Sequence, residues 1–188
     1  MFVDGEEHRH ISLIGNAFPY AFDMAPDEIF EKNFRQLLSE KGENATSFFT
    51  TFPLLFKFTR DGDIEQVDRY LLHDGTWSRM LREGATITME AWGDKFKANQ
   101  DWNHAWGAAP ANIIPRMFCG IRPVEPGFKR FIVDPQPGNV ESFSFRMPTV
   151  KGEVKLEWSK DKKQLTVPEN TEALYQGKIL GAGTHTLN

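Results

Sequence analysis

The sequence predicts an α+β fold, with helices over the first two thirds of the chain and short strands over the remainder. In the first part, apolar residues recur at helical spacing between capping and helix-breaking residues. After Gly120, short segments alternate apolar and polar residues between Gly, Pro or Asn, which is typical of a small antiparallel β-sandwich. The segment 120–126 is the predicted boundary, so residues 1–120 form the helical part and residues 121–188 the β-sandwich.

Helices are expected in the first part over residues 11–22, 26–41, 46–59, 63–75, 77–82 and 104–118. Pro26 suits the first position of the second helix, where its missing N–H costs nothing. The third segment is almost wholly apolar and Phe-rich, as in a helix that is buried on most sides. Pro110 and Pro115 must kink or break the last helix.

Strands are expected over residues 128–133, 142–146, 152–158, 164–167, 173–175 and 184–187. The run from Val154 to Trp158 alternates apolar and charged side chains, the pattern of a half-buried strand.

The composition predicts a folded chain and excludes several partners. Of 188 residues, 40% are hydrophobic and 13% aromatic, and the net charge is −4. Such a chain has no basic field for nucleic acid or an anionic membrane, and its apolar runs are too short to cross a bilayer. Residues 1–7 lack the basic and apolar regions of a secretion signal, which is uninformative about the compartment if the chain is a fragment.

Several residues read as structural. The lone Cys119 has no partner for an internal disulfide, and its apolar neighbours predict a buried thiol. His8 and His10 have the spacing of ligands on one strand face, but no third ligand group follows, so no metal site is expected. No phosphate-binding Gly-rich loop or nucleophile elbow is present, and no cofactor is expected.

The residues best suited to catalysis and sugar binding are concentrated between Gly84 and Gly138. The segment 84–92 reads Gly-Ala-Thr-Ile-Thr-Met-Glu-Ala-Trp, and the segment 102–107 reads Trp-Asn-His-Ala-Trp-Gly. A carboxylate, an imidazole and indoles thus stand just before a Pro/Gly-rich hinge. Glycoside hydrolysis uses carboxyl groups for acid–base chemistry, so this composition suits a sugar-binding site at the seam between two domains.

The same string resembles the C-terminal part of the bacterial α-L-rhamnosidases, glycoside hydrolase family 78. The resemblance implies a catalytic (α/α)6 helical barrel followed by a C-terminal β-domain, of which this chain would hold about half the barrel and the sandwich. The family pattern Thr-Thr-x-Trp-Glu-x-Trp places its general base on Glu90. Met89 stands where the family generally has Trp, and Ile87 where a Thr is common, which bears on the sugar preference.

The resemblance also implies roles for the neighbouring residues. His104 is expected to hydrogen-bond a rhamnose hydroxyl or to orient Glu90. Trp92 matches the motif and is expected to form a wall of the sugar pocket, with Glu90, Trp92 and His104 on one concave surface. Asn103 is expected to belong to the substrate-binding residues beside His104 and to cap the following helix. Trp106, like Trp102, fits a sugar-stacking position and a core position equally well.

The resulting prediction is the C-terminal fragment of an inverting hydrolase that cleaves terminal α-L-rhamnosyl residues from glycosides or polysaccharides. Its general base is present, but no upstream acid matches the family's proton donor, so the isolated chain is expected to be inactive. The alternative is a non-catalytic carbohydrate-binding or structural module. Half a barrel would expose Phe48, Phe52 and Phe56, so the expected protein partner is the missing N-terminal part or a second copy.

Overall fold

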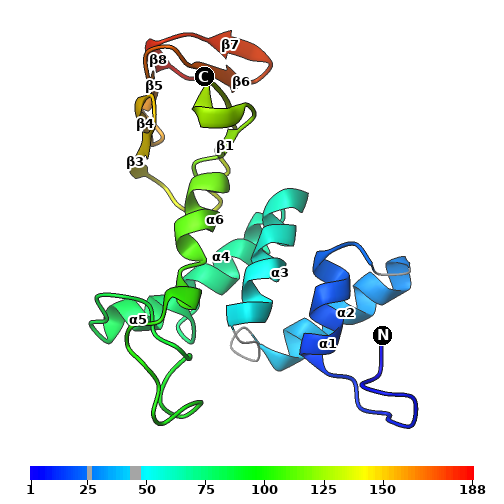
Figure 1. The fold of residues 1–188 in the computed structure, drawn as a ribbon. Coiled ribbons are helices and arrows are strands. Elements are labelled where there is room, and N and C mark those ends of the chain that lie inside the picture. Colours follow the sequence, from blue (N-terminus) through cyan, green and yellow to red (C-terminus); the bar gives the residue numbers. More distant parts are fainter. Residues whose placement is uncertain (25–26, 43–47) are drawn as a thin grey trace. The chain divides into compact units, whose positions relative to one another are not determined.

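The computed structural model describes residues 1–24, 27–42 and 48–188, which divide into two compact units (Figure 1). The helical unit comprises Met1–Pro110 and the sandwich unit comprises Ala111–Asn188. The α+β class predicted from the sequence is confirmed. The domain boundary after residue 120 stays a prediction, because the division into units reflects compactness alone.

The helical unit is a succession of packed helices, and their bounds are α1 (Leu13–Ala21), α2 (Glu28–Lys41), α3 (Phe48–Asp61), α4 (Ile64–Leu72) and α5 (Trp77–Arg82). Helix α1 packs against α2 and α3, α3 packs against α4, and α4 packs against α5. The Asp27 carboxylate accepts from Phe30 N at 2.8 Å and caps α2, and Asp63 caps α4. Pro26 lies outside the described residues. No helix in the described part of the chain is both long and apolar enough for a membrane span.

The irregular helix predicted over residues 104–118 is broken before Pro110, as one of the two prolines led us to expect, so only its continuity is wrong. The structure has a 3₁₀ turn, η2 (Ala105–Gly107), and a separate helix, α6 (Pro110–Arg116), which crosses the division between the units. Pro110 takes the first position of α6, where a residue without an N–H is tolerated. Asn103 does not cap η2, because the preceding residue is His104 and no side chain provides a capping hydrogen bond.

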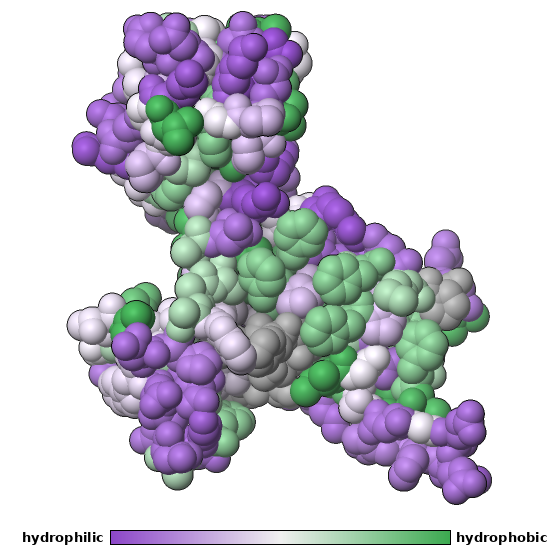
Figure 2. All heavy atoms as spheres, in the orientation of Figure 1, coloured by the Kyte–Doolittle hydropathy of each residue, from purple (hydrophilic) through white to green (hydrophobic). Residues whose placement is uncertain are grey.

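An apolar face spans α1 and α3. Its residues are exposed although hydrophobic, and they are Ile14, Phe18, Phe22, Phe52 and Phe56. They recur at a spacing of four on each helix, which places them on one side of it. Figure 2 shows this apolar surface over the two helices. Phe52 and Phe56 are each 38% exposed, as expected, whereas the side chain of Phe48 lies outside the described part.

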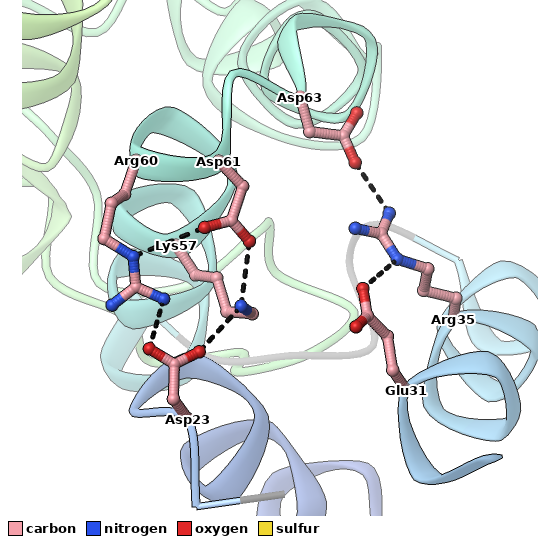
Figure 3. Close-up of polar contacts among 7 residues, drawn as sticks. All are labelled: Asp23, Glu31, Arg35, Lys57, Arg60, Asp61 and Asp63. Carbon is pink, nitrogen blue, oxygen red and sulfur yellow. Dashed lines mark hydrogen bonds and ion pairs between the residues drawn. The ribbon is translucent and has the colours of Figure 1, made fainter. Parts of the chain in front are cut away.

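A buried lysine fastens α1 to α3 (Figure 3). Lys57 is 8% exposed, and its Nζ donates to Asp23 Oδ1 at 2.9 Å and to Asp61 Oδ2 at 2.8 Å. Arg60 reaches the second oxygen of Asp23 at 2.6 Å. Burial alone would lower the pKa of Lys57, but the hydrogen bonds to Asp61 and Asp23 together with the negative charges of these residues outweigh it and raise the pKa. The hydrogen bond from Lys57 lowers the pKa of Asp23. The ionised Asp23 therefore stabilises the fold, and this stabilisation is lost as acid protonates Asp23.

A second ion pair fastens α2 to the start of α4. Arg35 donates to Glu31 at 3.1 Å and to Asp63 at 2.6 Å (Figure 3). Its guanidinium carbon also lies 5.7 Å from the ring centroid of the buried Tyr20 on α1. Arg35 on α2 therefore contacts both α1 and the start of α4.

The sandwich unit consists of two sheets. The first has the order β1 (Ile121–Pro123), β2 (Arg130–Val133), β6 (Glu172–Tyr175), β7 (Lys178–Leu180). The second has the order β3 (Phe143–Thr149), β4 (Gly152–Trp158), β5 (Lys163–Val167), β8 (Gly183–Thr186). The predicted sandwich is confirmed, with one parallel pair, β2 and β6, among antiparallel ones. This pair is parallel because the chain leaves β2, builds β3 to β5 in the other sheet, and returns along β6.

The sandwich core contains side chains from both sheets. Phe131, Val133 and Ala173 come from the first sheet, and Val154, Leu156, Leu165 and Val167 come from the second. Cys119 belongs to this core and is 1% exposed, and burial raises the pKa of its thiol to about 12. The buried thiol expected from the sequence is therefore confirmed, and Cys119 is unreactive at neutral pH.

Candidate active site

Two loops that follow α5 are held side by side by backbone hydrogen bonds. His104 N donates to Thr88 O at 2.8 Å, and Glu90 N donates to Asp101 O at 2.9 Å. The Thr88 hydroxyl donates to His104 O at 2.6 Å. These bonds fix the register of residues 88–90 against residues 101–104, and this register brings Glu90 and His104 together.

The Glu90 carboxylate is engaged at both oxygens. Lys97 Nζ forms a hydrogen-bonded ion pair with Oε1, and Asp101 N donates to Oε2 at 3.1 Å. The side chain of Glu90 remains 20% exposed. The hydrogen bond from Lys97, followed by that from Asp101 N, lowers the pKa of Glu90 below its ordinary value. Glu90 is consequently ionised at neutral pH, the state that a general base requires.

Glu90, Asp101 and His104 form one compact cluster. A carboxylate oxygen of each acid and a ring nitrogen of His104 lie within 4.8 Å of one another. Glu90 and His104 thus fall well within reach of one bound monosaccharide, as expected from the sequence. A divalent cation is compatible with two carboxylates and an imidazole. Lys97 already balances the charge of Glu90, however, so we assign no ion to the cluster.

The indoles near this cluster differ in their exposure. Trp92 is 5% exposed, and its ring lies edge-on to Trp77 at 4.8 Å between centroids. Trp77 Nε1 donates to Gly107 O at 2.6 Å, so the Trp77 and Trp92 rings pack beneath the two loops inside the helical unit. The buried position of Trp92 favours a supporting role, and its expected contact with sugar stays a prediction.

Trp106 presents its ring to solvent. It is 60% exposed, and its centroid lies 5.4 Å from that of His104 in an edge-to-face arrangement. Trp102 is 47% exposed.

Met89, which stands where the family pattern has Trp, is 1% exposed and lies with its backbone N 3.5 Å from Met80 Sδ. Met89 therefore faces the core of the helical unit, and the surface at the cluster is formed by other residues.

Sequence reasoning missed Lys97 and Asp101, the two residues that bind the Glu90 carboxylate. The available signal was the charged and polar stretch 93–101, which connects the two loops. Arg79 was missed as well. Arg79 lies on α5, and its side chain donates from Nη1 to Trp92 O at 2.8 Å, where the guanidinium lies against Gly93.

The sequence profile of the bacterial alpha-L-rhamnosidase 6 hairpin glycosidase domain matches residues 5–118 of the 188. The chain belongs to the bacterial α-L-rhamnosidase family. The profile of the bacterial alpha-L-rhamnosidase C-terminal domain matches residues 120–175. These matches confirm the family resemblance and the partial helical barrel followed by a sandwich.

Relatives in the family are much longer than this chain. An alpha-L-rhamnosidase of Alteromonas sp. (strain LOR) is 26% identical over 195 residues, covering 91% of this chain and 20% of that protein. The α-L-rhamnosidase structure from Aspergillus terreus matches with a TM-score of 0.78 at 20% identity, over 94% of this chain and 24% of that one. The Streptomyces avermitilis enzyme complexed with L-rhamnose matches with a TM-score of 0.72 at 21% identity, over 87% of this chain and 18% of that one. This rhamnosidase-family chain therefore spans about a fifth to a quarter of their length.

Proposed function

We propose that this chain is the C-terminal part of an inverting glycoside hydrolase that removes terminal α-L-rhamnosyl residues, with Glu90 as its general base. The observation that carries the proposal is the partly exposed Glu90 carboxylate, which Lys97 and Asp101 N hold ionised beside His104. The substrate class is supported by membership of the α-L-rhamnosidase family and by a relative that is complexed with L-rhamnose.

In this proposal, Glu90 removes a proton from the water that attacks the anomeric carbon. The His104 ring donates to or accepts from a sugar hydroxyl, and the exposed Trp106 offers an indole face to the apolar side of a deoxysugar. The acid that protonates the leaving oxygen comes from the rest of the barrel. In an inverting enzyme its carboxyl group stands roughly 6.5–9.5 Å from that of Glu90, which leaves room for the water.

The test is hydrolysis of an aryl α-L-rhamnoside, followed by proton NMR of the released sugar. We expect the complete enzyme to release the β-anomer first, because one displacement inverts the anomeric centre. The isolated 188-residue chain should show negligible turnover, since loss of general acid help alone costs about 10²–10⁴-fold. Initial release of the α-anomer would contradict inversion. Turnover by the isolated chain that disappears in Glu90→Gln would place a second catalytic carboxyl within these residues.

The protein partner in this proposal covers the apolar face of α1 and α3. In the complete enzyme this partner is the remaining part of the barrel, and in the isolated chain it is a second copy. We expect the isolated chain to sediment as an oligomer, because exposed apolar patches drive association. The double variant Phe18→Gln/Phe56→Gln should shift it toward monomer, whereas Ile179→Gln, an exposed apolar residue on β7, should not. A wild-type monomer that melts sharply would contradict this expectation.

The exposure of Trp102 and Trp106 favours a second candidate, a non-catalytic carbohydrate-binding module. Such a module binds glycan through stacked indoles, and Glu90 only hydrogen-bonds the sugar. Glu90→Gln in the complete protein separates the two, because turnover depends on this carboxylate only if Glu90 is the general base.

A further inference from the structure

We propose that Lys97 is a positioning residue for Glu90. It fixes the orientation of the Glu90 carboxylate, and its positive charge opposes the repulsion between Glu90 and Asp101. This inference rests on the proposed function, since it gives Lys97 a part in preparing the general base. Lys97 itself need not touch the substrate.

The need for a cation follows from the cluster. Carboxylate oxygens of Glu90 and Asp101 lie within 4.8 Å of each other and of a His104 ring nitrogen. Two like charges at this separation repel, which disfavours the ionised form of Glu90, and a positive charge beside Glu90 opposes that effect. A protonated Glu90 is too weak a base to take a proton from water. Lys97 Nζ, bound to Glu90 Oε1, is the cation that opposes this.

Other charged groups near the loop are already engaged elsewhere. Arg79 is bound to Glu83 and to Trp92 O. Lys95 Nζ lies over the ring of Phe96, 4.8 Å from its centroid. Asp94 accepts from Gln100 Nε2 at 2.6 Å.

The loop holds Lys97 in this place from both ends. Phe96 N and Lys97 N donate to Gly93 O at 2.9 and 3.4 Å, and Gln100 N donates to Lys97 O at 3.2 Å. The Gln100 side chain accepts from Ala91 N at 3.2 Å, which ties the far end of the loop to the residue after Glu90. Lys97 is therefore carried by a folded turn rather than by a free surface loop, and its side chain is still 42% exposed.

The orientation of Glu90 follows from the same contacts. Asp101 N, a backbone group fixed by the register of the two loops, holds Oε2, and Lys97 holds Oε1. With both oxygens held, the plane of the carboxylate is set before a substrate arrives. Such preorganisation lowers the barrier because no group has to reorient during the reaction.

The test is a titration of the Glu90 side-chain carboxyl by carbon-13 NMR in the 188-residue chain. We compare wild type, Lys97→Met, Lys97→Arg and the control Lys95→Met, which removes a neighbouring lysine that does not touch Glu90. In Lys97→Met the Glu90 midpoint should rise by about one pH unit or more, since a nearby opposite charge shifts a carboxyl by that amount. Lys97→Arg and Lys95→Met should titrate close to wild type. An unchanged midpoint in Lys97→Met, or an equal rise in Lys95→Met, would overturn the proposal.

A kinetic measurement on the complete enzyme gives the second readout. In Lys97→Met, the midpoint of the acid limb of kcat/KM against pH should move to higher pH by the same amount as the NMR midpoint. In Lys97→Arg it should lie close to that of wild type, because this limb reports the essential base of the free enzyme. A uniform loss of activity with an unmoved limb would overturn the positioning role. If the complete enzyme does not hydrolyse the rhamnoside at all, the proposed function fails, while the NMR titration still decides how Lys97 acts on Glu90.

Discussion

Replacing Glu90 with Gln in the complete enzyme is expected to lower kcat by about 10²–10⁴-fold, the usual contribution of general base catalysis. The amide has nearly the same shape but cannot accept a proton from water. The hydrogen bond from Asp101 N can persist on the amide oxygen, so the loop should keep its fold. KM should change much less than kcat, because the lost interaction belongs to the transition state.

The sandwich unit offers a matched control for this variant. Glu157 on β4 forms an ion pair with Lys162, and that hydrogen bond lowers its pKa as Lys97 lowers that of Glu90. Glu157→Gln therefore removes a comparable Glu–Lys pair without touching the cluster, and kcat should stay within about twofold of wild type, as for a surface substitution. A loss of less than about tenfold in Glu90→Gln, or an equal loss in Glu157→Gln, would exclude Glu90 as the general base.

The sequence predicts the helical elements well where local chemistry determines them. Asp27 caps α2 and Asp63 caps α4, and α2 ends at Gly42. The segment 104–118 was mispredicted because its form depends on contacts that are distant in sequence. The hydrogen bonds from His104 N to Thr88 O and from Trp77 Nε1 to Gly107 O hold it as a loop and a short turn, overriding its helical propensity.

The candidate site was predictable in part for the same reason. A polar loop between Glu90 and His104 is enough to suggest that they converge, and they do. Which side chain of that loop reaches Glu90 depends on the register set by Glu90 N and Asp101 O, and no local pattern encodes it. The exposure of the indoles is likewise a tertiary property: Trp92 is buried against Trp77, and Trp106 is open.

Gly120→Ala is expected to destabilise the sandwich unit by about 3 kcal/mol, the largest effect on stability that we predict, as a sum of backbone strain and overpacking. Gly120 has φ of +63°, a conformation that costs an L-residue with a Cβ about 1–2 kcal/mol. A Cβ there would also lie 1.9 Å from Asp134 O and 2.0 Å from Asp134 C. These are backbone atoms, and Asp134 N donates to Gly120 O at 3.1 Å, so the two segments cannot separate without losing this bond and shifting Cys119 and Ile121 in the core.

Gly177→Ala is the control that separates strain from collision. Gly177 lies in the same unit with φ of +76°, and a Cβ there would meet nothing within 4 Å. It should therefore cost only the strain of about 1–2 kcal/mol. Because the chain has two units, whole-chain unfolding need not be a single transition, so the measurement is amide hydrogen exchange of β2 and β6. Their protection should fall much further in Gly120→Ala than in Gly177→Ala, while amides of α2 and α3 keep theirs. Equal losses in the two variants would show that the close approach of Gly120 to Asp134 contributes nothing beyond the backbone conformation.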